Sequence, residues 1–143
     1  MEALGRTVNA VLQGDGVYIN LRDCSGVAFA CYLAGAAGDT YTLVEARDAA
    51  GTGAQNLACI TRFYTNTGDG TDAWTKRTQA AAATVVTAAA ATQNAMWVEV
   101  DGTQLSSGYD YVKLTSTGSG RVTPLPRDLV VGRAPANLPA LGV

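Results

Sequence analysis

The sequence predicts an all-β protein, a single-domain antiparallel β-sandwich or barrel with extended terminal arms. Its apolar segments are mostly short and alternate with a two-residue period, which is typical of strands. The intervals favour turns, as in Gly14-Asp15-Gly16 and Thr67-Gly68-Asp69-Gly70. No long helical pattern alternates with the strands, so a parallel α/β sheet is disfavoured. The 143 residues are enough for one such domain.

The first half of the chain contains four candidate strands, at Val17–Leu21, Val27–Leu33, Tyr41–Ala46 and Leu57–Tyr64. In the third, the alternation places Glu45 on the same face as Leu43. In the fourth, it places Ile60 on the same face as Tyr64 and opposite Phe63. Each segment is bounded by turn-forming residues, so we expect four separate strands.

The second half adds candidate strands at Trp74–Thr78, Met96–Asp101, Tyr109–Thr115 and Leu129–Arg133. The clearest alternation is in Met96–Asp101, where Trp97 and Glu99 face away from the three apolar residues Met96, Val98 and Val100. Pro124 and Pro126 restrict the segment between them to a sheet edge or a crossing, because proline lacks the N–H that a central strand donates.

Two segments fit both a helix and a strand. Gln79–Gln93 is rich in alanine, the best helix former, but its centre is Thr84-Val85-Val86-Thr87. Four β-branched residues in a row favour a short strand at Thr84–Thr87 between Ala-rich turns. Leu4–Leu12 has helical spacing but also fits a strand that pairs back through Gly14–Gly16, and we favour this hairpin. Residues 1–12 are therefore an arm or a hairpin strand of a domain that spans 1–133.

The last ten residues, 134–143, form a distinct segment without charged side chains and with two prolines. The prolines disfavour a helix, and the composition is too apolar for a plain disordered tail. We expect an extended arm that docks either on its own domain or on a neighbouring subunit. The candidate partner-contact residues are Leu4, Val8, Trp97, Leu138, Leu141 and Val143.

Charge and residue usage exclude several classes of protein. Ten basic against twelve acidic residues give a net charge of −2, which argues against a nucleic-acid-binding face. The absence of histidine removes His-based acid–base catalysis and His-ligated metal sites. The three cysteines have no C-x-x-C spacing and are expected to be small buried residues. No signal-peptide pattern or apolar run of membrane-spanning length is present, so we expect no membrane association.

The remaining candidate sites are weak. Glu99 and Asp101 share a strand face, with carboxylates about 6–7 Å apart, a spacing that could suit a glycosidase. A solvated face with Trp97 as an aromatic anchor is the favoured interpretation, because glycosidase carboxylates normally come from different elements of a deep cleft. Trp74 and Trp97 could line a sugar-binding surface, which makes a carbohydrate-binding module the alternative of another class. We therefore predict no catalytic, cofactor-binding or metal-binding residues and no enzymatic activity.

The low charge favours an assembly role. Charged residues make up 15% of the chain, and 25 Ala, 17 Thr and 16 Gly replace the missing charge. Soluble monomers usually keep a charged, mixed surface. A surface of small neutral residues suits a protein that packs into a symmetric array, so we expect a homo-oligomer.

Three stretches resemble small virion proteins of tailed bacteriophages. The first is the pattern L-x-E-A-x-D-A-x-G-x-G-A-x-x-L over 43–57, followed by Trp74-Thr75-Lys76. The others are Met96–Asp101 with the segment that follows it, and the closing residues 133–143.

The resemblance implies a decoration (cement) or minor head protein on an HK97-like shell. The implied partners are the major capsid protein and copies of this chain, a trimer being favoured, with no direct nucleic-acid contact. The implied location is the virion capsid, and the host cytoplasm during assembly. A head-to-tail connector or tail-tube subunit is the alternative within the same setting, and the resemblance implies no cofactor.

Overall fold

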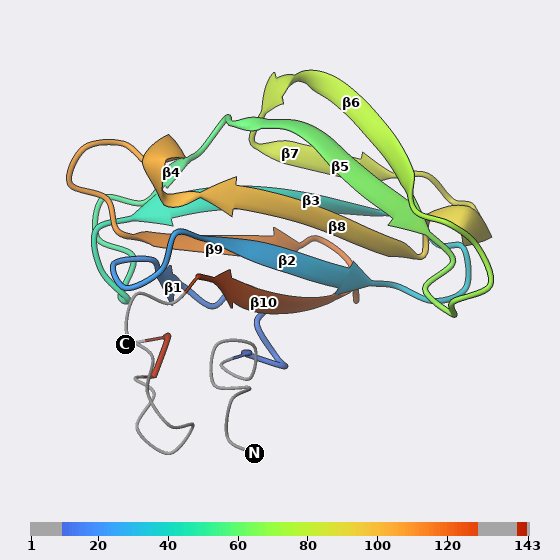
Figure 1. The fold of residues 1–143 in the computed structure, drawn as a ribbon, viewed down its shortest axis with the longest axis horizontal. Coiled ribbons are helices and arrows are strands. Elements are labelled where there is room, and N and C mark those ends of the chain that lie inside the picture. Colours follow the sequence, from blue (N-terminus) through green and yellow to red (C-terminus); the bar gives the residue numbers. More distant parts are fainter. Residues whose placement is uncertain (1–9, 129–139, 143) are drawn as a thin grey trace.

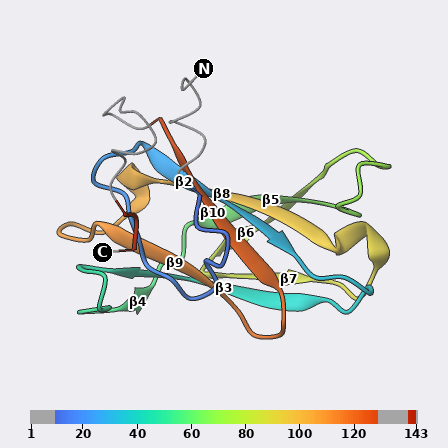
Figure 2. The same cartoon turned by 90° about the horizontal axis from the view of Figure 1, so that it is seen from below.

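The computed structural model describes residues 10–128 and 140–142. Two antiparallel sheets pack face to face as a sandwich, and the described ranges contain no α-helix (Figure 1). The view turned by 90° shows the two layers, with β2, β8 and β5 in one and β9, β3 and β4 in the other (Figure 2). The all-β prediction is confirmed, and of its two forms the structure has the sandwich and not the closed barrel.

Sheet A contains β1 (Ile19–Asn20), β9 (Tyr111–Ser116), β3 (Asp39–Ala46) and β4 (Gln55–Asn56) in that order, and β7 (Thr84–Thr87) also pairs with β3. Leu43 of β3 lies opposite Leu114 of β9, and Tyr41 lies opposite Val85 of β7. β3 is thus the central strand, paired with β9 along one edge and with β7 and β4 along the other.

Sheet B has the order β10 (Arg121–Arg127), β2 (Gly26–Tyr32), β8 (Ala95–Asp101), β5 (Ile60–Asn66) and β6 (Thr75–Ala82). Phe29 at its centre lies between Val98 of β8 and Pro124 of β10. Two single 3-10 turns, η1 (Ala91–Gln93) and η2 (Gly102–Gln104), flank β8. The prediction that the two prolines mark a sheet edge is confirmed, because β10 is an edge strand.

The core lies between the sheets and follows the predicted alternation. The least exposed large side chains come from both layers: Tyr41, Leu43 and Leu114 from sheet A, and Phe29, Met96 and Val98 from sheet B. Cys24 and Cys31 are buried and Cys59 is half-buried, all three as free thiols. Burial raises the pKa of all three thiols above their ordinary value.

Two details of the strand prediction are wrong. β6 extends through Ala82, so the first Ala-rich stretch is strand and not a turn, whereas the predicted strand at Thr84–Thr87 is confirmed as β7. Ile60 does not share a face with Tyr64. A register shift between Ile60 and Arg62 interrupts the alternation, and Ile60 is buried together with Phe63.

The described part of the predicted N-terminal hairpin is also different. Residues 10–12 form no strand with 17–21, because the Val11 and Gly14 N–H groups donate to the carbonyls of Pro124 and Val122, at 3.3 and 2.9 Å. This segment therefore lies along the outer edge of β10 and covers part of it. Gly14 is required there, since a Cβ would overlap the ring of Pro124. The predicted strand Leu129–Arg133 lies outside the described residues.

The tip of the C-terminal arm contacts its own domain. Leu141 is 6% exposed and belongs to the main apolar core. Its carbonyl accepts a hydrogen bond from the Asn20 N–H of β1, at 2.9 Å. The sequence left two placements open for this arm, on its own domain or on a neighbouring subunit. The described tip docks on its own domain.

Candidate functional site

An aromatic groove on the outer face of sheet B is the main candidate site. Tyr64, Trp74 and Trp97 line an open cavity of about 390 Å³. We call these three residues the aromatic groove. Among the described residues the lining of this cavity includes no charged side chain, so a bound molecule would meet almost only aromatic carbon.

The strand register brings the three side chains together. Trp97 points outward because its neighbours in β8, Met96 and Val98, point into the core. Tyr64 of β5 lies directly opposite Trp97, and Trp74 immediately precedes β6, the next strand. The Trp74 and Trp97 rings meet edge to face, with centroids 6.5 Å apart and planes at 66°. The groove is therefore a notch between angled rings and not a flat platform.

The groove is bordered by a small ionic cluster on the same face. The indole N–H of Trp97 donates to Glu99 Oε1 at 3.2 Å. The guanidinium of Arg127 contacts Glu99 at 3.5 Å and also pairs with Asp101. Both carboxylates of the possible glycosidase pair are thus engaged with one cation. They line a polar cavity of about 210 Å³ together with Arg62, Gln104 and Arg127.

A buried carboxylate, Glu45, holds a loop at one end of the sandwich. It is 1% exposed, and it accepts hydrogen bonds from Gln55 Nε2 at 2.6 Å and from the backbone N–H and hydroxyl of Ser106 at 2.9 and 2.6 Å. Burial alone would raise the pKa of Glu45, but these donors outweigh it and the pKa lies below its ordinary value. The alternation that placed Glu45 beside Leu43 was the sequence signal for this burial.

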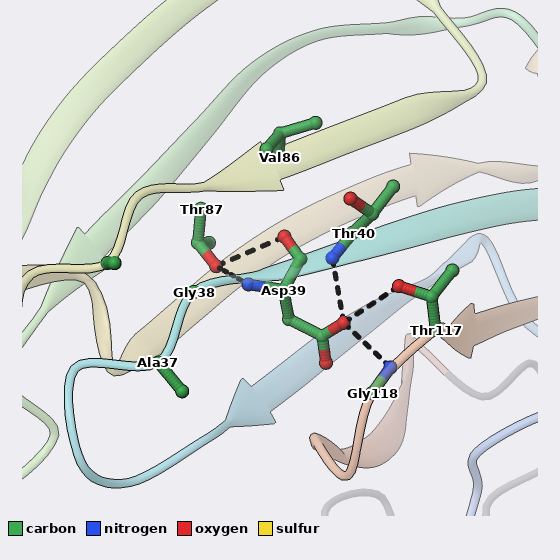
Figure 3. Close-up of a pocket in the computed structure, with 9 residues that line it drawn as sticks. Ala37, Gly38, Asp39, Thr40, Val86, Thr87, Thr117 and Gly118 are labelled. Atoms are coloured by element: carbon green, nitrogen blue, oxygen red, sulfur yellow. Dashed lines mark hydrogen bonds between the residues drawn. The ribbon is translucent and has the colours of Figure 1, made fainter.

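A second buried carboxylate, Asp39, lies at the opposite end of β3 beside a cavity of about 340 Å³ (Figure 3). It accepts hydrogen bonds from the Thr40 and Gly118 N–H groups at 2.7 and 3.0 Å, from the Thr117 hydroxyl at 3.1 Å, and from the Ser116 hydroxyl. Burial opposes ionisation, but the hydrogen bonds prevail and lower the pKa of Asp39. Its carboxylate ties β3 to the turn between β9 and β10, which is a structural role that the sequence analysis missed.

The structure describes only two of the predicted contact residues, Trp97 and Leu141. Trp97 lies in the aromatic groove, and Leu141 is buried in its own core, which leaves it little surface for a partner. Leu4, Val8, Leu138 and Val143 lie outside the described residues.

Comparison with protein-family models, with curated proteins and with solved structures finds no match to this chain.

Two further properties describe the ranges 10–128 and 140–142. They contain no group of three or more His, Cys, Asp or Glu side chains placed to hold a metal ion. They also contain no helix with the length and apolarity that crossing a bilayer would require. The groove, the ionic cluster and the two buried carboxylates are thus the features from which a function has to be argued.

Proposed function

We propose that this protein is a virion structural protein of a tailed bacteriophage, which decorates and stabilises the capsid through symmetric protein–protein contacts. The observation that carries the proposal is the aromatic groove, an apolar recess on the outer face of a sandwich with few charges. Recesses of this kind receive an apolar anchor from a protein partner. The resemblance of 43–57, 74–76 and 96–101 to small phage virion proteins supports the proposed setting.

Other exposed apolar side chains support an assembly role. Leu12 and Tyr32 are 70% and 44% exposed. These side chains are spread over the surface of a chain in which only 15% of residues are charged. The proposed partners are the major capsid protein and further copies of this chain, as a trimer.

The proposal assigns no catalytic role. Asp39 and Glu45 are the buried carboxylates of the described residues, and each accepts hydrogen bonds from its own fold. Groups held in this way by internal donors stabilise the sandwich. We therefore assign both to stability and not to chemistry on a substrate.

The test is light scattering on the purified protein followed by co-sedimentation with empty capsids of the parent phage. A monomer or trimer that pellets only with shells supports decoration. Rings or tubes that form without shells support the connector or tail-tube alternative. A stable monomer that ignores shells contradicts the proposal.

A carbohydrate-binding module is the second candidate, because aromatic faces on a β-sandwich can stack on sugar rings. Glycan-array binding that disappears in Trp97→Ala and persists in Val86→Ala would favour it. Val86 is a suitable control because it is an exposed apolar side chain outside the groove. Absence of binding to any glycan would leave the structural role as the better account of the groove.

A further inference from the structure

We propose that the aromatic groove receives the proline-containing segment 134–139 from a second copy of this chain. The inference rests on the proposed self-association and deepens it by naming the groove and its occupant. It requires that the segment suits the groove chemically and that the groove of its own copy is out of its reach.

The groove suits a proline-containing segment. Its lining is aromatic, and the indole N–H of Trp97 is already engaged with Glu99. Extended proline-rich segments dock in aromatic-lined grooves, where the preformed backbone limits the entropy lost on binding. The 66° angle between the two indole rings leaves a notch for a projecting ring or branched side chain. Sugar recognition usually needs several convergent polar groups, and this lining offers few.

The segment has matching chemistry. Its sequence is Ala134-Pro135-Ala136-Asn137-Leu138-Pro139, which carries no charge. A polyproline II helix has three residues per turn, so Pro135 and Leu138 would share one of its faces. Placing this face on the aromatic groove leaves no charge buried and unpaired.

Leu138 cannot reach the groove of its own copy while the tip of the arm stays docked. Leu141 is anchored beside β1 in sheet A, whereas the groove lies on the outer face of sheet B. Asn20 lies at the Ala46 end of β3, because both residues pair with Tyr111. The start of β8 lies near the other end of β3, where the Ala36 N–H donates to Asn94 at 3.0 Å. The 8 residues of β3 span about 25 Å, so the groove and Leu141 lie toward opposite ends of the sandwich as well as on different sheets. A fully extended chain spans about 3.3–3.6 Å per residue, so Leu138 stays within about 11 Å of Leu141. The groove of a second copy has no such restriction, since that copy can approach the arm.

The chain supplies its own reporter for this contact. It contains two tryptophans, and both line the groove. Tryptophan emission, excited selectively over tyrosine, therefore reports on the groove. In a dilution series of the full-length protein, we expect the emission to shift to the blue, and acrylamide quenching to fall, as the mass from light scattering rises.

Two variants and one control test the contact. Leu138→Asp introduces a charge into the segment, and Trp97→Ala removes one wall of the groove. Each is expected to weaken self-association at least about tenfold, since truncating a central interface anchor has effects of this size. Val86→Ala should associate as the unchanged protein does. Thermal unfolding of each variant separates loss of association from loss of the fold.

A synthetic peptide of residues 133–140 provides an independent measurement. It should shift the tryptophan emission, whereas a peptide with Asp in place of leucine at position 138 should not. Self-association that Leu138→Asp leaves intact, or an emission that the peptide does not change, overturns the inference. An oligosaccharide that shifts the emission equally in the Leu138→Asp protein overturns it in favour of sugar binding. Capsid binding is scored separately by co-sedimentation, so the proposed function can stand where this contact fails.

Discussion

Replacing Glu45 by glutamine tests whether a buried carboxylate secures one end of the sandwich. The side chain is 1% exposed and accepts three hydrogen bonds, one from Gln55 and two from Ser106. These bonds tie β3 to β4 and to the loop that follows η2. The replacement keeps the shape of the side chain and removes its charge.

The expected cost follows from the hydrogen-bond count. Bonds to a charged group contribute about 1.5–3 kcal/mol each, against about 1 kcal/mol for neutral ones. The introduced amide keeps one oxygen, which can accept from the Ser106 N–H. Its NH2 group then faces Gln55 and the Ser106 hydroxyl, and both of these can turn to accept from it. Burying a neutral amide also costs less than burying a carboxylate. We therefore expect Glu45→Gln to lower the free energy of unfolding by about 1–2 kcal/mol, and Glu45→Ala by about 3–5 kcal/mol, because alanine leaves the donors without an acceptor.

The effect has a defined pH dependence. The pKa of Glu45 is lower in the folded protein than its ordinary value of 4.5, so the ionised form is the one that the fold stabilises. Its contribution is complete above the unfolded pKa and is lost as the pH falls through the lower folded pKa. Urea unfolding of both proteins should show the full difference at about pH 7 and a much smaller one at about pH 3. Asp39 titrates in the same direction in both proteins, so its contribution cancels in the comparison.

Two results would refute this reasoning. Equal stability of Glu45→Gln and the unchanged protein at neutral pH would show that the carboxylate charge contributes nothing net. A difference that persists unchanged in acid would show that the substitution acts through packing and not through ionisation. The variant Ser106→Ala, combined with Glu45→Gln in a double-mutant cycle, measures the coupling of the two side chains directly.

Three further predictions follow from the edges of the sandwich. Leu141→Ala should lower the free energy of unfolding by about 2–3 kcal/mol in chemical denaturation, because the side chain is nearly fully buried. An unchanged denaturation midpoint would mean that Leu141 does not belong to the core of its own domain. Gly14→Ala should lower the free energy of unfolding by about 1–3 kcal/mol, measured by thermal unfolding, because the added Cβ overlaps Pro124. Gly102→Ala is the matched control, because its Cβ would lie 3.4 Å from the nearest atom, the Ser25 carbonyl oxygen. Equal effects of the two substitutions would contradict the steric argument. Arg127→Ala should change stability by less than about 1 kcal/mol, because its ion pairs are partly exposed, and a larger loss would show that they act as a buried network.

Much of the sandwich could be predicted from local alternation. Met96, Val98 and Val100 face the core, and Trp97 and Glu99 face outward, because a strand fixes which side chains share a face. The strand at Thr84–Thr87 could be predicted from its β-branched residues. Prediction from the local pattern failed where the hydrogen-bond ladder between β5 and β6 is irregular. The register shift beside Ile60 depends on how β6 pairs with β5, which no local window contains.

The aromatic groove shows the same limit. The sequence identified Trp74 and Trp97 as separate candidates, 23 positions apart. Their contact arises because β5 lies between β8 and β6 in sheet B. Tyr64 was recognised as a strand residue, but its place in the groove depends on its register opposite Trp97. Sheet order is set by pairings distant in sequence, so it decides which surface residues meet.

The sequence is enough to predict the all-β class, the inward and outward faces of the regular strands and the low charge. These properties depend on side-chain period and composition, which are local. The partners of the buried carboxylates, and the strand edges that Val11, Gly14 and Leu141 cover, depend on the tertiary structure. Glu45 meets Ser106, and Val11 meets Pro124, only after strands distant in sequence have paired. A buried polar group must find a donor wherever the fold supplies one, and no local pattern specifies that position.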